Sequence, residues 1–350
     1  MKTLWYYFIK ILVKSSLFLY FKNIKVNGIK NIPNKGAVLF MVNHPNALLD
    51  PLIVAVNNPR IQHFLVRAAT FKNPYVKKFL GTLNLMPIYR IRDGVKQLGK
   101  NQKIFQKCFS LLKNKEALMI FPEGSHNKKR TIRTLSKGFS RIVFGAIEKN
   151  PALKIHIIPV GLTYQNPSVF PTAVSLEYGK PILANDYYNP NHPNSAIKKM
   201  KDDISKQLKN LSVHIPDDEY YQNTLNNLNQ ANVNFTNVVG INNMIKTSKV
   251  SKRKQQFNLF KFLKPVIIIN NIISWLLWKY VEKKIDEFEF IDTFRFGICT
   301  ISFGIFHPIQ SYLIAHFFNW KLGVIYFFSS IILILLYVKF HPTETKSTLG

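Results

Sequence analysis

Short apolar segments alternate with helical patterns between residues 25 and 210. Apolar runs of five or six residues predict strands at 37–42, 61–66, 85–89, 117–121, 155–160 and 173–177. Apolar positions at helical spacing predict helices at 48–56, 95–113, 137–149 and 194–211. Strands that alternate with helices are typical of α/β proteins. Residues 25–215 are therefore predicted to form an α/β domain, in which a layered sheet is flanked by helices.

The C-terminal part of the chain carries long uncharged segments. Residues 322–338 hold no charge, and residues 296–318 hold none either, although a histidine and a proline interrupt them. A membrane span needs roughly 17–25 mostly apolar residues, so residues 261–340 are predicted to contain a transmembrane helical hairpin. The alternative is a buried pair of helices in a soluble core. A third run, 265–278, is short and contains two asparagines, which leaves either two or three spans open.

The N-terminal 24 residues show a different pattern. Aromatic and aliphatic residues cover most of a helical surface, and Lys10 and Lys14 form a narrow polar stripe. Aromatic residues edged by lysine are typical of helices that lie in the membrane interface, so residues 1–24 are predicted as a membrane-interface helix. The alternative is a helix packed on the α/β domain. A signal peptide is disfavoured because the two lysines break the apolar region and no small-residue cleavage site follows.

Two further segments are polar. Residues 216–260 are rich in asparagine and glutamine and end in a basic run from Lys249 to Lys254. They are predicted as a polar and basic linker, or a loose helical segment, whose cations lie near anionic lipid headgroups. Residues 341–350 are predicted as a tail.

Positive charge is concentrated in the first 260 residues. They hold 39 basic and 12 acidic side chains, a net charge of +27, out of +30 for all 350 residues. Such a field attracts phosphate, whether on nucleic acid, anionic lipid or a metabolite, and the positive-inside rule places this region on the cytoplasmic side of a membrane. An apolar content of 47% excludes intrinsic disorder. The two cysteines exclude a disulfide framework or a cysteine zinc cage.

Several common motifs are missing from the sequence. It has no Walker loop, no G-x-G-x-x-G, no H-E-x-x-H, no G-x-S-x-G and no aromatic RNA-binding signature. We therefore expect no metal, no cofactor and no nucleic acid partner.

Polar residues instead follow the predicted strands, where α/β domains place their sites. After the strand at 37–42 come Asn43 and His44, and Asp50 follows about a turn and a half later. A histidine is suited to act as a general base near neutral pH. A carboxylate fixes its tautomer and stabilises the imidazolium that forms. The alternative is a structural histidine and an aspartate in the first turn of a helix.

The third and fourth predicted strands are also followed by candidate residues. Arg90 and Arg92 follow the third strand, and arginine is suited to bind phosphate or carboxylate; a solvated charge pair is the alternative. Glu123, Gly124 and Ser125 follow the fourth strand and place a carboxylate beside open backbone N–H groups.

The chain then continues with a basic triplet. Lys128, Lys129 and Arg130 either hold a phosphate or form a solvated loop. Pro159 and Gly161 belong to the fifth predicted strand, and as single residues they are best explained by the shape of that strand.

Four motifs occur in order in this basic domain: N-H-P-N-A-L-L-D at 43–50, P-I-Y-R at 87–90, F-P-E-G at 121–124 and I-P-V-G at 158–161. In this order they resemble the glycerolipid acyltransferase superfamily, over roughly residues 20–210. Members acylate glycerol-3-phosphate, lysophosphatidate and related lysophospholipids. The C-terminal apolar region is similar to that of some longer members.

The resemblance implies a role for each matching residue. His44 is the general base and Asp50 orients it. Arg90 matches the arginine that binds the acceptor phosphate. Glu123 and Gly124 match the acceptor-binding element. Pro159 matches the fourth motif, on the acyl-donor side; the remaining candidates, Asn43, Arg92, Ser125 and the basic triplet 128–130, are expected to contact substrate.

Two positions depart from the family pattern. Four residues separate the histidine and aspartate in the family, whereas five separate His44 and Asp50; Pro45 absorbs the extra residue if it bends the chain before the helix begins. Phosphatidate-forming members often have Thr-Arg after Glu-Gly, where this chain has Ser125 and His126. The Ser-His variant resembles some glycerol-3-phosphate acyltransferases.

Because His126 stands where those members have an arginine, another residue must contact the acceptor phosphate, or the acceptor is a different molecule. The candidates for this contact are Arg92 and the cluster 128–130.

The resemblance implies a membrane-bound acyltransferase. It would move a fatty acyl group from acyl-CoA or acyl-carrier protein to the hydroxyl of 1-acylglycerol-3-phosphate, forming phosphatidate in phospholipid synthesis. The alternative acceptors are glycerol-3-phosphate, or a lysophospholipid in a remodelling reaction. A non-catalytic membrane protein that binds anionic lipid or nucleic acid is the alternative of another class. It explains the charge, but not why His44, Arg90 and Glu123 all follow strands.

Overall fold

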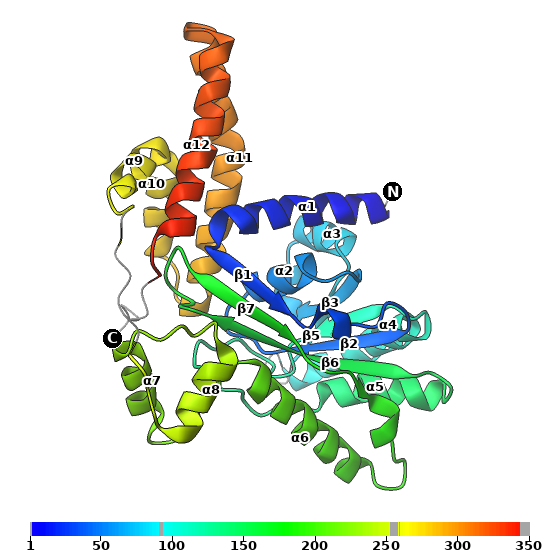
Figure 1. Cartoon of the computed structure of the whole chain (residues 1–350). Coiled ribbons are helices and arrows are strands. Elements are labelled where there is room, and N and C mark those ends of the chain that lie inside the picture. The colour runs from blue at the N-terminus through cyan, green and yellow to red at the C-terminus, as the bar shows by residue number, and fades with distance from the viewer. Residues whose placement is uncertain (1, 91–93, 253–257, 259, 344–350) are drawn as a thin grey trace.

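The computed structural model describes residues 2–90, 94–252, 258 and 260–343. In this part of the chain an eight-stranded sheet carries helices on both faces, and two long helices extend away from it (Figure 1). The strands are β1 (Asn23–Asn27), β2 (Ala37–Val42), β3 (Gln62–Arg67), β4 (Leu85–Ile88), β5 (Ala117–Ile120), β6 (Ile155–Tyr164), β7 (Ala173–Tyr178) and β8 (Ile182–Leu183). The α-helices are α1 (Lys2–Tyr20), α2 (Leu49–Val56), α3 (Pro74–Thr82), α4 (Asn101–Lys113), α5 (Gly138–Lys149), α6 (Pro193–Leu211), α7 (Tyr221–Gln230), α8 (Val238–Thr247), α9 (Leu263–Asn270), α10 (Ile272–Glu282), α11 (Ile291–Phe317) and α12 (Trp320–Phe340).

The strand order places several strand ends at one edge of the sheet. The order is β1-β7-β6-β2-β5-β3-β4, and β8 pairs with β6. The strands from β6 to β4 are all parallel, whereas β7 runs antiparallel to β6. In this register Met41 of β2 lies between Ile120 of β5 and Pro159 of β6. The loops that follow β2, β4, β5 and β6 therefore meet at one edge.

Alternating side chains of β2 divide the core into two layers. Leu39 and Met41 belong to a cluster with buried residues of α4, α5 and α6. Val38, Phe40 and Val42 belong to a cluster with buried residues of α1 and α2 on the opposite face. A strand buried on both faces reads as a continuous apolar run, which is why this segment was recognisable from the sequence.

The predicted α/β class, a layered sheet flanked by helices, is confirmed. The six predicted strands correspond to β2 through β7, and the four predicted helices correspond to α2, α4, α5 and α6, with α6 beginning one residue earlier than predicted. The sequence analysis missed β1, β8 and α3. β1 is a short edge strand with mixed polar residues, and α3 has no buried residue among its nine, so neither has a strong apolar pattern.

Helix α1 combines the two alternatives considered for the N-terminus. Leu17 and Tyr20 are buried against the domain, whereas Leu4, Phe8 and Ile11 are exposed. In Figure 1 the helix runs crosswise to α11 and α12 at the end of that pair nearer the sheet. If that pair crosses a bilayer, α1 therefore runs along the membrane plane with an apolar face outward, as an interfacial helix does.

Residues 216–260 differ from the expected linker. They include α7 and α8, whose apolar residues form a separate small core with Leu228, Phe235 and Ile241 buried at its centre. Widely spaced apolar residues among many asparagines are enough to pack two helices together. Much of the basic run that ends this segment lies outside the described residues, as does most of the tail predicted at 341–350.

Two helices of the described residues are long and apolar enough to cross a membrane. They cover Phe288–Phe317, which contains α11, and Trp320–Phe340, which is α12. A helix of 21 residues is about 31 Å long, close to the hydrocarbon thickness of about 30 Å. The third apolar run is divided into α9 and α10 at Asn271, so each piece is too short to span. The geometry favours two spans over three.

Candidate active site

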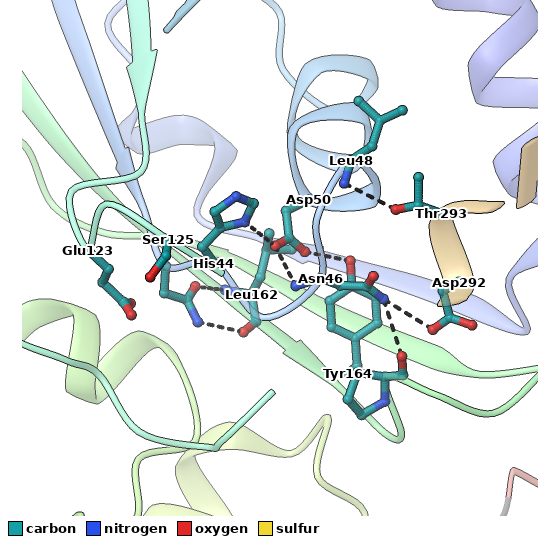
Figure 2. Close-up of polar contacts among 12 residues, drawn as sticks. His44, Asn46, Leu48, Asp50, Glu123, Ser125, Leu162, Tyr164, Asp292 and Thr293 are labelled. Carbon is teal, nitrogen blue, oxygen red and sulfur yellow. Dashed lines mark hydrogen bonds and ion pairs between the residues drawn. The ribbon is translucent and has the colours of Figure 1, made fainter. Parts of the chain in front are cut away.

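A histidine and an aspartate meet at the carboxyl end of β2. Nδ1 of His44 lies 2.7 Å from Oδ2 of Asp50 (Figure 2). The backbone N–H of Asn46 donates to the same carboxylate oxygen over 2.7 Å, and the N–H of Asp50 donates to the carbonyl of Asn46. A turn at Pro45–Leu48 thus precedes α2 and absorbs the fifth intervening residue. The unusual spacing does not separate the pair.

The carboxylate of Asp50 is fully buried and surrounded by donors. The hydroxyl of Tyr164, at the end of β6, donates to Oδ1 over 2.7 Å. Burial raises the pKa of Asp50, while the hydrogen bonds from Asn46 and Tyr164 oppose that rise by stabilising the carboxylate. Both oxygens of the Asp50 carboxylate therefore accept hydrogen bonds, and these bonds orient Oδ2 toward Nδ1 of His44.

His44 is arranged to accept a proton. Burial, and secondly the positive charge of Arg133, lower the pKa of the imidazole, so it is neutral near pH 7. With Nδ1–H donated to Asp50, Nε2 carries the free lone pair; among the described residues Nε2 has no hydrogen-bond partner. The ring stacks on Phe121 with centroids 3.9 Å apart. The pair is therefore oriented and in the correct protonation state for a general base.

Asn43 attaches the loop between β2 and α2, which we call the catalytic loop, to β6. Its amide nitrogen donates to the carbonyl of Leu162 over 3.0 Å, and its amide oxygen accepts from the N–H of Leu162 over 2.6 Å. Asn43 was predicted to contact substrate. Its amide binds the neighbouring strand and so fixes the start of the loop that carries His44. Asn43 also lines the small cavity beside His44, and its contact with substrate stays a prediction.

The Glu-Gly loop after β5 lies beside His44 (Figure 2). Glu123 is almost completely buried and pairs with Nε of Arg133 over 2.7 Å. Arg133 also donates to Oγ of Ser125 over 2.8 Å. Burial raises the pKa of Glu123, and Arg133 opposes this. Gly124 takes a left-handed φ of 75°, which glycine adopts at little cost.

Arg133 was missed by the sequence analysis. It lies eight residues beyond Ser125 in a segment without helix or strand, so no periodic pattern marked it. Glu123 and Ser125 therefore both bind Arg133, and these contacts fix the conformation of the Glu-Gly loop beside His44.

Arg90 reaches the same loop from β4. Its Nη1 donates to the carbonyl of Gly124 over 3.1 Å. The structure therefore brings the arginine motif to the Glu-Gly motif. Arg92 lies outside the described residues.

The basic triplet separates into three environments. Lys128 is half-buried and donates to Oγ of Ser168 over 2.8 Å; burial lowers the pKa of its ammonium. Lys129 is exposed and pairs with Asp217 over 2.8 Å. Arg130 donates to the carbonyls of Tyr164 and Gln165 and stacks on a phenylalanine. All three residues line the small cavity beside His44, and the guanidinium of Arg130 also binds two backbone carbonyls. Their predicted contact with substrate stays a prediction.

Pro159 lies inside β6 rather than at its end. It is buried, sits opposite Met41 of β2, and its carbonyl accepts from the N–H of Gly179. Pro159 is not among the described residues that line the cavity beside His44. Its predicted role on the acyl-donor side stays a prediction.

The start of α11 adds residues that the strand-end search did not consider. Nδ2 of Asn46 donates to Oδ2 of Asp292 over 3.1 Å, and the N–H of Leu48 donates to Oγ1 of Thr293 over 3.2 Å (Figure 2). Just before α11, Glu287 lies 3.1 Å from Nε2 of His126. The segment that leads into α11 therefore contacts the α/β domain beside the Glu-Gly loop.

The space beside His44 is small in this conformation. A cavity of about 20 Å³ is lined by His44, Glu123, Lys128 and their neighbours. That volume holds a water molecule. Among the described residues, no group of three or more His, Cys, Asp or Glu side chains is placed to hold a metal ion.

The fold and the site together define a class: an α/β protein in which a histidine–aspartate pair is poised to take a proton beside cationic loops. Comparison with known proteins then gives the family. The sequence profile described as Acyltransferase matches residues 23–163. This region therefore belongs to the acyltransferase family, and the resemblance to the glycerolipid acyltransferase superfamily is confirmed.

Individual relatives are more distant. An alignment of 121 residues is 30% identical to Glycerol-3-phosphate O-acyltransferase 1 of Saccharomyces cerevisiae, covering 33% of this chain and 16% of that protein. An alignment of 320 residues is 20% identical to Glycerol-3-phosphate O-acyltransferase 2 of the same yeast, covering 61% and 43%. The chain thus spans less than half the length of either yeast protein.

A solved structure was also matched. The crystal structure of the 1-acyl-sn-glycerophosphate (LPA) acyltransferase PlsC from Thermotoga maritima aligns with a TM-score of 0.39 and 17% identity, covering 53% of this chain and 72% of that one.

Proposed function

We propose that this protein is a membrane-bound O-acyltransferase that moves a fatty acyl group from a thioester to a hydroxyl of a phosphorylated glycerol. The observation that carries the proposal is the His44–Asp50 pair, 2.7 Å apart, with Nε2 of His44 left to accept a proton. The family of residues 23–163 supports the same reaction class.

The proton path follows from the geometry of this pair. Nε2 of His44 takes the proton of the acceptor hydroxyl while the oxygen attacks the thioester carbonyl. The imidazolium is stabilised by Asp50 through Nδ1–H. The C–S bond then breaks, and the proton passes from Nε2 to the leaving thiolate. This direct transfer needs no acyl-enzyme, and neither cysteine lies in the site: Cys108 is buried in the core, and Cys299 lies in α11.

The cations around the pair supply a site for the acceptor phosphate. Arg90 reaches the Glu-Gly loop, and Lys128 lines the small cavity beside His44. Guanidinium and ammonium groups bind phosphate through charge-assisted hydrogen bonds. Because the cavity holds only a water-sized volume, binding of a glycerol phosphate requires the loops around His44 to move apart.

Two acceptors fit this site. We put glycerol-3-phosphate first, because both yeast relatives are named for that acceptor and because Ser125-His126 resembles the variant found in some of those enzymes. The acceptor expected from the sequence, 1-acylglycerol-3-phosphate, is the second candidate; an apolar cavity beside the membrane helices favours it, as described below.

The acyl donor would be acyl-CoA or acyl-carrier protein, and the catalytic domain would face the cytoplasm. The net charge of +27 in the first 260 residues supports both an anionic donor and this orientation. An apolar hairpin beside the catalytic domain keeps it at the surface from which lipid substrates come.

The test is acyl transfer by the purified full-length protein in detergent, with one labelled acyl-CoA and each acceptor in turn. We expect product with glycerol-3-phosphate, with 1-acylglycerol-3-phosphate, or with both, and none with the His44→Ala variant. Absence of transfer to every phosphorylated glycerol, from acyl-CoA and from acyl-carrier protein, would reject the proposal. Salt-sensitive DNA binding in its place would favour the non-catalytic alternative.

A further inference from the structure

A second cavity lies between the catalytic domain and the membrane helices. Its volume is about 430 Å³, within the range of small-molecule sites. Residues of α1, α9, α10, α11 and α12 and of the loop at 168–170 line it. We call it the interhelical cavity. Its helices lie outside the segment 23–163 that matches the family, so it is an addition to the shared domain.

The lining of the interhelical cavity is complementary to a lipid that has a hydrocarbon chain and a negatively charged headgroup. Its walls are mainly aromatic and aliphatic, including Trp275, Trp278 and Phe303. Three cationic side chains, Lys264, Lys279 and Arg295, also line it, and no lining residue is acidic. Apolar walls with cations and no carboxylate complement a molecule with a hydrocarbon chain and a negative headgroup.

The interhelical cavity approaches the active site at Ser168. Arg295 donates to the carbonyl of Ser168 over 3.2 Å, and Lys128, which lines the cavity beside His44, donates to its hydroxyl over 2.8 Å. Arg295 also pairs with Asp292 over 2.9 Å, and Asp292 accepts from Asn46 of the catalytic loop. One layer of polar residues therefore lies between the interhelical cavity and the histidine pair.

We propose that the interhelical cavity binds the acyl chain of a 1-acylglycerol-3-phosphate, with the phosphate end toward Ser168, where Lys128 and Arg295 converge. The proposal rests on the proposed function, since this molecule is the product when glycerol-3-phosphate is the acceptor and is itself the acceptor in the alternative. In both cases the same lipid must sit with its headgroup near His44 and its chain away from water.

The source of the lipid is the bilayer rather than the aqueous phase. Three helices of the lining, α10, α11 and α12, also expose large apolar residues on their other faces. A chain already dissolved in the membrane enters between such helices without crossing water. Each methylene buried there strengthens binding about three- to fourfold, so affinity should rise with chain length until the cavity is full.

Photolabelling of the full-length protein in nanodiscs tests this site without any acyl donor. The probe is 1-acylglycerol-3-phosphate with a diazirine near the end of its chain. Cys299→Trp places a large ring in the interhelical cavity, since Cys299 lines it. Ile301→Trp, two residues on in the same helix, is the matched control because Ile301 is 64% exposed.

We expect labelled peptides from α10 and α11, a loss of labelling of at least fivefold in Cys299→Trp, and no loss in Ile301→Trp. An unlabelled long-chain 1-acylglycerol-3-phosphate should compete, and glycerol-3-phosphate should not. Equal labelling of both variants would identify lipid that merely surrounds the helices and would overturn the proposal. Preferential labelling by a photoreactive acyl-CoA would assign the cavity to the donor chain and overturn it as well.

A second measurement covers the case in which Cys299→Trp does not fold. The melting temperature of the wild-type protein is followed with 1-acylglycerol-3-phosphates of increasing chain length. Stabilisation that grows with chain length supports the site, and stabilisation independent of chain length contradicts it. Neither assay needs turnover, so the two proposals can fail separately. Labelling without acyl transfer would support the lipid site and reject the proposed function. Acyl transfer without labelling would support the proposed function and reject the lipid site.

Discussion

The side-chain amide of Asn46 donates a hydrogen bond to Asp292 over 3.1 Å, although 246 positions separate the two residues. Asn46 belongs to the loop that holds Asp50 through its backbone N–H. Asp292 lies in the first turn of α11 and is held by Arg295. The first turn of α11 is thus bonded directly to the loop between β2 and α2, and the position of one depends on the other.

Asp292→Asn should lower kcat about tenfold with little change in the KM of either substrate. The substitution keeps the shape of the side chain but removes the charge that holds Asn46 and Arg295, and a hydrogen bond to a charged group contributes about 1.5–3 kcal/mol. Steady-state kinetics in detergent measure the effect, with the melting temperature recorded alongside. Asp286→Asn is the matched control, because Asp286 is exposed before α11; equal kcat values for the two variants would show that the contact does not position the loop.

His44→Ala should reduce acyl transfer by about 10²–10⁴-fold, the range for loss of a general base. His63→Ala is the control, since His63 lies in β3 and pairs with Glu116 over 2.6 Å. It should keep nearly full activity. Acyl transfer near the wild-type rate in His44→Ala would remove His44 as the base.

The pH dependence of kcat/KM should show an acidic limb below pH 6.5, the ordinary pKa of histidine being about 6.5. Burial and Arg133 lower the pKa of His44, and the base must be neutral to accept a proton. Activity is therefore present above the lowered pKa and is lost as the pH falls through it. A limb centred at or above pH 6.5 would contradict this assignment.

Tyr164→Phe should lower kcat about three- to tenfold. The change removes one donor from the buried carboxylate of Asp50 and costs about 1–3 kcal/mol of stability, the usual penalty for a buried group that loses its partner. Tyr187→Phe is the control for a lost tyrosine hydrogen bond: its hydroxyl donates to Asp203 over 2.7 Å, and Tyr187 packs on the core cluster across the sheet from the one that contains Tyr164. Activities that fall equally in both variants would mean that Tyr164 acts only through stability.

Arg90→Ala should raise the KM of the phosphorylated acceptor about tenfold or more while the KM of the acyl donor changes less than about twofold. A charge-assisted contact to phosphate contributes roughly twice as much as a neutral hydrogen bond. Arg141→Ala is the matched control, since Arg141 is an exposed arginine on α5 and does not line the cavity beside His44. A larger effect on the donor than on the acceptor would reverse the role of Arg90.

The sequence by itself determined the α/β class and the order of its motifs. Strands buried on both faces must be continuous apolar runs, so β2, β5 and β6 were recognisable. Parallel strands end at the same edge, and for that reason the residues after them could be grouped into one candidate site. His44, Asp50, Arg90 and Glu123 were found in this way, whereas the contact of Arg90 with Gly124 came from the structure.

Only the tertiary structure decided which hydrogen-bond partners these residues have. Arg130 and Asn43 bind backbone carbonyls, and Arg133 was invisible because an irregular segment has no periodicity to mark it. The contact of Asp292 with Asn46 joins segments at opposite ends of the chain. Hydrophobic patterning reports which face of an element is buried, but it carries no information about which polar groups long-range packing brings together.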